Sequence, residues 1–279
     1  MKSKKTRTLK NATIKRNRRR YQQRGGASYI QSQRIENDHY KIITANIDND
    51  TGMVVDLYIG KAKAIFPVNQ GCGRESICPN PPPPMYLYHG KGVLYTWVSD
   101  NIFHIYEGNF KDNERSGKGK QTRFRSNGPI QHGIQTLHDL EVMTMEQVNQ
   151  LMNSLSTNND ILEVYDGTWE NGMMHGNGKL LITRNKSLYV GEFQKGMMHG
   201  IGKLKINNDI YHGDFKNGLM HGNGKLVYQT GVSYEGEWYE GKMHGLGKIV
   251  YRDGHTNNVE YNNGNFIRRL PTGSVFGKG

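Results

Sequence analysis

Long apolar runs are missing from this sequence. Across 279 residues, no stretch approaches the ~18 uncharged apolar residues of a membrane-spanning helix. The N-terminus is basic and lacks the apolar segment of a secretory signal. We therefore expect a soluble, intracellular protein, cytoplasmic by default, with a nuclear or membrane-peripheral location as the alternatives.

Cysteine is nearly absent as well. Cys72 and Cys78 both lie in the stretch GCGRESICPN, six residues apart. They could close a small disulfide or supply half of a zinc site, but structural zinc takes four ligands and the chain has no second cysteine pair. Two free thiols in a reducing compartment are the simplest interpretation.

Acidic residues are missing from the first 34 positions, which hold 12 of the 37 Lys and Arg residues. The remaining 25 basic residues match 25 acidic ones, so the net charge of +12 belongs to the N-terminal arm. Residues 1–28 have little to bury and are predicted to be disordered. Five bases within six positions could contact anionic lipid or nucleic acid, or form a solvated tail: Lys15, Arg16, Arg18, Arg19 and Arg20.

Glycine, in contrast, is abundant, at 35 residues, because a short unit recurs. YDGTWENGMMHGNGKLLI begins at Tyr165, and close copies begin at Tyr189, Tyr211 and Tyr234, at spacings of 24, 22 and 23 residues. A degenerate copy begins at Tyr106. HGKGVLY at 89–95 and VEYNNGNF at 259–266 resemble the second and first halves of a unit. A fixed period in the low twenties indicates a repeat architecture.

One unit has the pattern of a β-hairpin. Tyr165, Gly167 and Trp169 alternate with polar residues, as in a strand with one aromatic face. Asn171-Gly172 is a strong turn signal, and the return strand alternates through Gly176, Gly178 and Leu180. We expect the rings to lie over the glycines. The predicted core residues are Tyr106, Phe110, Tyr165, Gly167, Trp169, Tyr189, Gly191, Phe193, Tyr211, Gly213, Phe215, Tyr234, Gly236 and Trp238.

The predicted fold class is all-β, an elongated, twisted antiparallel sheet of stacked hairpins. At ~4.8 Å per strand and two strands per repeat, five repeats span ~50 Å. A single hairpin is marginal alone, so neighbours must stabilise one another. The apolar face of this sheet is expected to need a cover, which could be a hairpin at 39–66, a helix at 145–155 or another copy of the protein.

The flanking segments are predicted from composition. Residues 29–66 contain two β-branched runs around DNDTG, which predict a hairpin over 39–66. Residues 67–84 form a Gly- and Pro-rich linker, and the array covers 85–267 with an insert at 130–160. In this insert a capping box, Thr144 and Gln147, precedes a short predicted helix, and residues 268–279 form a tail. The helix has one apolar face: Met145, Val148, Leu151, Met152 and Leu155.

Structural roles explain the recurring histidines, glycine-rich segments and carboxylates better than metal binding, phosphate binding or catalysis does. The histidines at 175, 199, 221 and 244 share one repeat position, but equivalent positions are ~10 Å apart, too far to share a zinc ion. HGNGK lacks the first glycine and the hydroxyl of a phosphate-binding loop. Carboxylates such as Glu192, Asp214 and Glu237 alternate with lysines on the polar face. The sequence predicts no enzyme, no metal, no cofactor and no small-molecule substrate.

The unit Y-x-G-x-(W/F)-x-x-G-x-M-H-G-x-G-K-(L/I) closely resembles the MORN (membrane occupation and recognition nexus) repeat, over roughly 85–267. The resemblance implies a rod of stacked hairpins that acts as a scaffold, often dimeric, for protein partners. The hypothesis is a non-catalytic protein-interaction module able to self-associate as a homodimer, with the basic arm as a tether. A peripheral membrane adaptor on anionic phospholipid is the alternative, and nucleic-acid binding through the arm is the third.

Overall fold

A computed structural model of the chain describes residues 21–23, 26–36, 39–48, 52–65, 85–99, 102–125 and 160–271, and the helical positions Glu146 and Gln150. The strands are β1 (Tyr21–Gln23), β2 (Gly26–Glu36), β3 (His39–Asp48), β4 (Gly52–Ile65), β5 (Met85–Ser99), β6 (Ile102–Lys111), β7 (Glu114–Arg125), β8 (Asp160–Glu170), β9 (Met173–Ile182), β10 (Ser187–Gln194), β11 (Met197–Ile206), β12 (Asp209–Lys216), β13 (Leu219–Val227), β14 (Ser233–Tyr239), β15 (Lys242–Val250), β16 (Thr256–Asn262) and β17 (Asn265–Leu270).

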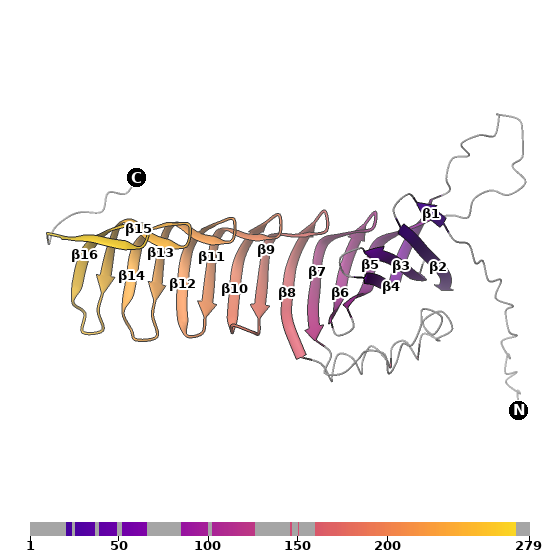
Figure 1. The fold of residues 1–279 in the computed structure, drawn as a ribbon, viewed down its shortest axis with the longest axis horizontal. Coiled ribbons are helices and arrows are strands. Elements are labelled where there is room, and N and C mark those ends of the chain that lie inside the picture. The colour runs from indigo at the N-terminus through magenta and orange to yellow at the C-terminus, as the bar shows by residue number, and fades with distance from the viewer. Residues whose placement is uncertain are drawn as a thin grey trace, which may run out of the picture.

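The strands form one long antiparallel meander. Each strand pairs with the next along the chain, from β1–β2 through β16–β17. Figure 1 shows the strands lying across the long axis of the molecule and succeeding one another along it. The predicted fold class, an elongated all-β sheet of hairpins, is confirmed.

Tight turns set the hairpin period. Asn171 and Gly172 both have positive φ, 49° and 73°, as the two central residues of the favoured hairpin turn require. From the β8–β9 hairpin onward, each hairpin turn is also tied to its neighbour, because the turn glycine donates its N–H to a carbonyl of the preceding hairpin. Gly196 bonds in this way to Met174, and Gly218 to Met198, both at 2.9 Å. The turn edge is therefore a continuous ladder.

The array begins earlier than the sequence indicates. β4 pairs with β5, so the strand that contains HGKGVLY forms a hairpin with the strand that carries Tyr58 and Gly60. Residues 67–84 thus connect two strands of one hairpin. At the far end β17 continues to Leu270, past the predicted limit at 267.

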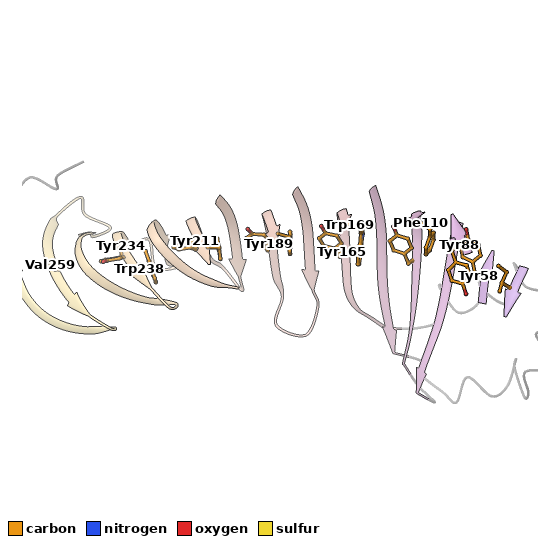
Figure 2. Close-up of a cluster of buried hydrophobic side chains, with 14 residues drawn as sticks. Tyr58, Tyr88, Phe110, Tyr165, Trp169, Tyr189, Tyr211, Tyr234, Trp238 and Val259 are labelled. Carbon is orange, nitrogen blue, oxygen red and sulfur yellow. The ribbon is translucent and has the colours of Figure 1, made fainter. Parts of the chain in front are cut away.

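The aromatic face needs no second layer, contrary to our expectation. Tyr165 is 1% exposed and Trp169 4% within this single chain. The strands curve, and the buried rings lie in one row along the array (Figure 2). The 39–66 hairpin, β3 and β4, pairs edge to edge with the array. It extends the sheet instead of covering it.

Several expectations fall outside the described residues. These are the five arm bases between Lys15 and Arg20, the cysteines, the 67–84 linker and the apolar face of the predicted 145–155 helix. The predicted boundary between arm and body at 28 falls inside β2, since β1 and β2 begin at Tyr21 and Gly26. Positions 21–23 and 26–28 are therefore strand, not part of a disordered arm.

Candidate interaction sites

Each hairpin is built on one tyrosine and two glycines. Gly167 and Gly178 face each other across β8 and β9, and the Tyr165 ring lies on both, so that a Cβ added at either would meet the ring. The same unit occurs six times, with the first one missed by the sequence analysis: Tyr58/Gly60/Gly92, Tyr106/Gly108/Gly119, Tyr165/Gly167/Gly178, Tyr189/Gly191/Gly202, Tyr211/Gly213/Gly224 and Tyr234/Gly236/Gly247.

The tyrosine hydroxyl explains why the ring is not phenylalanine. Tyr165 Oη donates a hydrogen bond to the carbonyl of Thr168, three residues later, at 2.8 Å. Equivalent bonds, from 2.5 to 3.2 Å, recur in the other five units. Burial of the hydroxyl, the largest cause, raises the pKa of Tyr165 to about 12. The hydroxyl therefore remains protonated and fixed at neutral pH.

The rings of successive hairpins pack edge to face. Tyr165 contacts Trp169 of its own strand at 5.1 Å between centroids and Phe193 of the next hairpin at 5.0 Å. Such links run without a break from Tyr58 to Phe266. Each aromatic pair contributes about 0.5–1.5 kcal/mol beyond burial. All the aromatic residues predicted for the core are buried in this ladder.

A bulge in the return strand gives the first glycine of that strand, Gly176, a different role from Gly178. The register passes from Gly167↔Gly178 to Thr168↔His175, which leaves Gly176 and Asn177 unmatched. Gly176 has a φ of 58°, which favours glycine. An added Cβ there would meet Thr168, not a ring. Our expectation that Gly176 lies under an aromatic ring was therefore wrong.

The recurring carboxylates stabilise this bulge. Asp214 Oδ2 accepts the N–H of Asn223 at 2.8 Å, and Glu237 Oε1 accepts that of Leu246 at 3.1 Å. Glu192 has the same role at a longer distance, 3.4 Å to the N–H of Ile201. These side chains satisfy backbone donors that the bulge removes from the strand ladder. Their repetition thus has a structural cause.

One hairpin departs from the pattern in its core. At two positions beside the rings the other units hold apolar residues, for example Met174 and Leu180, but the Tyr106 hairpin has Arg115 and Gln121. Arg115 Nη1 donates a hydrogen bond to Gln121 Oε1. The guanidinium carbon of Arg115 lies 4.5 Å from the centroid of the Trp169 ring. A polar island thus interrupts the apolar row.

A hollow of about 260 Å³ opens beside this island. Next to it, His104 Nε2 and Arg123 Nε are buried and have no hydrogen-bond partner. His104 and Arg123 face each other across β6 and β7. Burial, and then the charges of Arg123 and Arg115, lower the pKa of His104 to about 4. The hollow is lined by Leu94, Thr96, His104, Tyr106, Asn113, Glu114, Arg115, Gln121 and Gly172.

The last strand, β17, is the other unusual feature. Phe266 faces Tyr261 across β16 and β17, as Met243 faces Trp238 in the hairpin before. Met243 is partly buried, whereas Phe266 is 54% and Ile267 52% exposed. No described residue pairs with the outer edge of β17, at the yellow end of Figure 1.

Comparison with known families agrees with this geometry. The family model described as "MORN repeat" matches residues 106–124, 165–183, 189–209, 211–233 and 234–256. Each match begins on the tyrosine of one of the units described above. The chain is a MORN-repeat protein. No curated protein has a matching sequence.

The MORN unit continues beyond the five matches. The Tyr58 unit carries the same glycine pair and the same tyrosine–carbonyl bond. In the final hairpin Asn257 stands at the tyrosine position, opposite Ile249, and Val259 at the first glycine position, opposite Gly247. Ring and glycine are lost together, because Val259, 1% exposed, needs the space that a ring would occupy. This hairpin therefore lacks the ring-and-glycine unit.

The histidine column of the MORN units lies beside the turns. His175 Nδ1 lies 3.3 Å from Glu170 Oε2, and His244 Nδ1 accepts the N–H of Asn263 at 3.2 Å. The described residues contain no group of three His, Cys, Asp or Glu side chains able to hold a metal. None of the described positions belongs to a helix with the length and apolar character of a membrane span. MORN-repeat proteins are generally non-enzymatic modules of protein or membrane interaction.

Proposed function

We propose that this MORN protein is a non-catalytic scaffold that self-associates through the outer edge of β17. The observation that carries the proposal is the exposure of Phe266 and Ile267 on β17, the last strand of the described residues, whose outer edge has no described partner. Elsewhere in the array the next hairpin covers the equivalent of Phe266. The rod holds its own core together, so its ends are available for assembly.

Edge strands favour further pairing. Their free N–H and C=O groups form a template for another strand, and proteins usually protect them with charge, proline or a bulge. Terminal units of repeat arrays normally carry a polar outer face. β17 has charge at Arg268 and Arg269, but Arg268 is engaged with Glu260 of its own hairpin at 2.6 Å. Among the described residues, the apolar pair beside it remains exposed.

A second copy of the chain is the occupant that suits this edge best. Two β17 strands related by a two-fold axis perpendicular to the sheet would run antiparallel, which continues the strand alternation of the array. Residues on the same face would then meet, so Phe266 can pack against its equivalent in the partner. Such an interface is isologous, the commonest kind in homodimers. With six residues in β17, the contact is small, and we expect a concentration-dependent dimer.

The experiment is light scattering after size exclusion on the full chain over a range of concentrations. The wild type is expected to approach twice the chain mass as concentration rises. The Phe266→Ser/Ile267→Ser double variant is expected to remain monomeric, while Ile201→Ser, which changes an exposed residue of mid-array, leaves dimerisation intact. A wild type that is monomeric throughout, or a double variant that dimerises like the wild type, would overturn the proposal.

The basic arm supplies the tether of the proposed scaffold. Its cluster, Lys15 to Arg20, would attract anionic lipid at about 1 kcal/mol per basic residue near the surface. Because β1 begins at Tyr21, a deletion of residues 1–20 removes the cluster and leaves the described strands. Flotation with phosphatidylserine vesicles should then be lost, without an effect on the dimer. Equal flotation of both proteins would exclude the arm as the tether.

A further inference from the structure

Two core positions of the Tyr106 hairpin have changed together. Opposite the Phe or Trp ring, four other units place a methionine, whereas this hairpin places Arg115 opposite Phe110. At the same position the Tyr58 unit has Tyr88, opposite Ala62, and the last hairpin has Phe266, opposite Tyr261. Opposite the tyrosine ring, the other units place Leu94, Leu180, Leu204, Leu226 or Ile249, whereas this one places Gln121. In the other repeats an apolar pair fills the space beside the rings. Packing alone therefore does not explain the polar pair Arg115 and Gln121.

The site also contains polar atoms that the described residues leave unsatisfied. His104 Nε2 and Arg123 Nε are both buried without a hydrogen-bond partner, an arrangement that costs stability and is rare in folded proteins. Both come from strands that line the hollow, β6 and β7, and they face each other in register. A ligand atom that accepts from these nitrogens would remove that cost.

Charge selects the class of ligand. Arg115 lines the hollow and Arg123 lies next to it, and both influence His104 enough to lower its pKa. His104 itself is neutral at pH 7. Glu114 also lines the hollow but is exposed, and Glu163 faces Arg123 from β8. Guanidinium groups in such a partly buried place favour a carboxylate or phosphate oxygen.

Size limits the ligand further. About 260 Å³ is below the roughly 300–1,000 Å³ of sites for small organic molecules. It suffices for one side chain, and the walls fit an amphipathic one. Leu94 and Tyr106 provide apolar surface for methylene groups, while Thr96 and Arg115 provide hydrogen-bond donors. An aspartate or glutamate side chain has this combination of a short apolar stem and an anionic end.

We propose that the hollow between β5, β6 and β7 binds the carboxylate of an Asp or Glu side chain from a partner protein. Its oxygens accept hydrogen bonds from Arg115, from Arg123 Nε and from His104 Nε2, and the proposal assigns the ring proton of neutral His104 to Nε2. The Trp169 face and Gln121 hold the Arg115 guanidinium in place for this contact. This inference rests on the proposed scaffold function and adds a second, anion-selective site at a distance from β17.

The test is a titration of the full isotope-labelled chain, observed at the Arg123 Nε–H resonance by NMR. The probes are acetyl-Gly-Glu-Gly-amide, the matched acetyl-Gly-Gln-Gly-amide and inorganic phosphate. We expect the Glu peptide to bind about tenfold or more tightly than the Gln peptide, since charge-assisted hydrogen bonds are the stronger kind. Arg115→Met/Gln121→Leu restores the apolar pair of the other repeats, so it should fold, gain stability and lose that preference. Lys120→Gln, on the exposed side of β7, is the matched charge control and should retain it.

The outcomes separate the hypotheses. Equal binding of the two peptides, or preference retained in the Arg115→Met/Gln121→Leu variant, overturns the proposal. Saturation by phosphate without selection for the Glu peptide overturns the assignment to a protein carboxylate. The proposed dimer forms through β17 and not through this hollow. The Arg115→Met/Gln121→Leu variant should therefore dimerise like the wild type. A failure here is therefore distinct from a failure of the scaffold function.

Discussion

The hydroxyl of Tyr189 lies 2.8 Å from the backbone carbonyl of Glu192, three residues later on the same strand. A second carbonyl, that of His199 on the facing strand, lies at 3.3 Å. Both carbonyls belong to the bulge, where the strand ladder is interrupted. One side chain thus fills the core, covers the glycine pair and holds the bulge in its bent form.

Tyr189→Phe removes the hydroxyl and keeps the ring. We expect a loss of about 1 kcal/mol in the free energy of unfolding, because a buried carbonyl loses its donor. Tyr189→Ala removes the ring as well and should cost about 3–5 kcal/mol. Urea denaturation followed by circular dichroism measures both. Tyr239→Phe, at an exposed ring, is the control and should stay within about 0.5 kcal/mol of the wild type. A Tyr189→Phe variant as stable as the wild type would exclude the hydroxyl bond as a stabilising contact.

Gly202→Ala should be destabilising because of the ring above it. The new methyl group would overlap the Tyr189 ring, and overpacking of a filled core costs about 1–3 kcal/mol. The cost should shrink in a Tyr189→Ala background, where the ring is gone. A double-mutant cycle measures this coupling, expected at about 0.5–3 kcal/mol. Gly196 lies in a turn with a φ of 82° and open space around it. The cost of Gly196→Ala in free energy of unfolding should therefore simply add to that of Tyr189→Ala. Additivity for Gly202 too would contradict the packing explanation.

A surface carboxylate that accepts a backbone N–H should contribute more to the free energy of unfolding than one that only forms an exposed ion pair. Asp214 accepts a backbone N–H of the bulge, so Asp214→Ala should cost about 1 kcal/mol, and Asp214→Asn, which keeps an acceptor, should cost less. Glu235 makes an exposed ion pair with Lys225 at 3.5 Å, worth between about 0 and 1 kcal/mol and weakened by salt. Chemical denaturation at low and high salt separates them. A cost for Asp214→Ala that disappears in salt would show that charge, not the bulge, matters there.

The repeated residues made the fold predictable from the sequence. Features that depart from the repeat were not predicted. The period of Tyr165, Tyr189, Tyr211 and Tyr234 sufficed for hairpins, turns and core. The Tyr58 unit was missed because residues 67–84 separate its two halves, although Tyr58-x-Gly60 followed by HGKG was a usable signal. Self-burial of the rings was also missed. A β-bulge bends the strand that contains it, and a sequence pattern of period two does not reveal a bulge.

The candidate sites were less predictable than the fold for a physical reason. Arg115 and Gln121 are visible in the sequence as departures from Met and Leu, but their meaning depends on unsatisfied nitrogens of His104 and Arg123, which only coordinates can show. Exposure of Phe266 likewise depends on where pairing stops. Repeat position therefore predicts burial well inside the array and poorly at its end.

Alkaline pH should unfold the array through its tyrosines. Burial, the largest cause, raises the pKa of Tyr106, Tyr165 and Tyr189 to about 12, whereas tyrosine in an unfolded chain has a pKa of about 10. Between these values the unfolded state loses the proton and the folded state keeps it. The free energy of unfolding is therefore at its full value below about pH 10 and falls as pH rises toward about 12. Urea midpoints between pH 8 and the onset of unfolding should show this decline, with a shallower slope in Tyr189→Phe. Tyrosinate absorbance should appear together with the loss of strand signal. Complete ionisation of the tyrosines near pH 10 in a chain that keeps its strand signal would refute the buried hydroxyls on which the ladder depends.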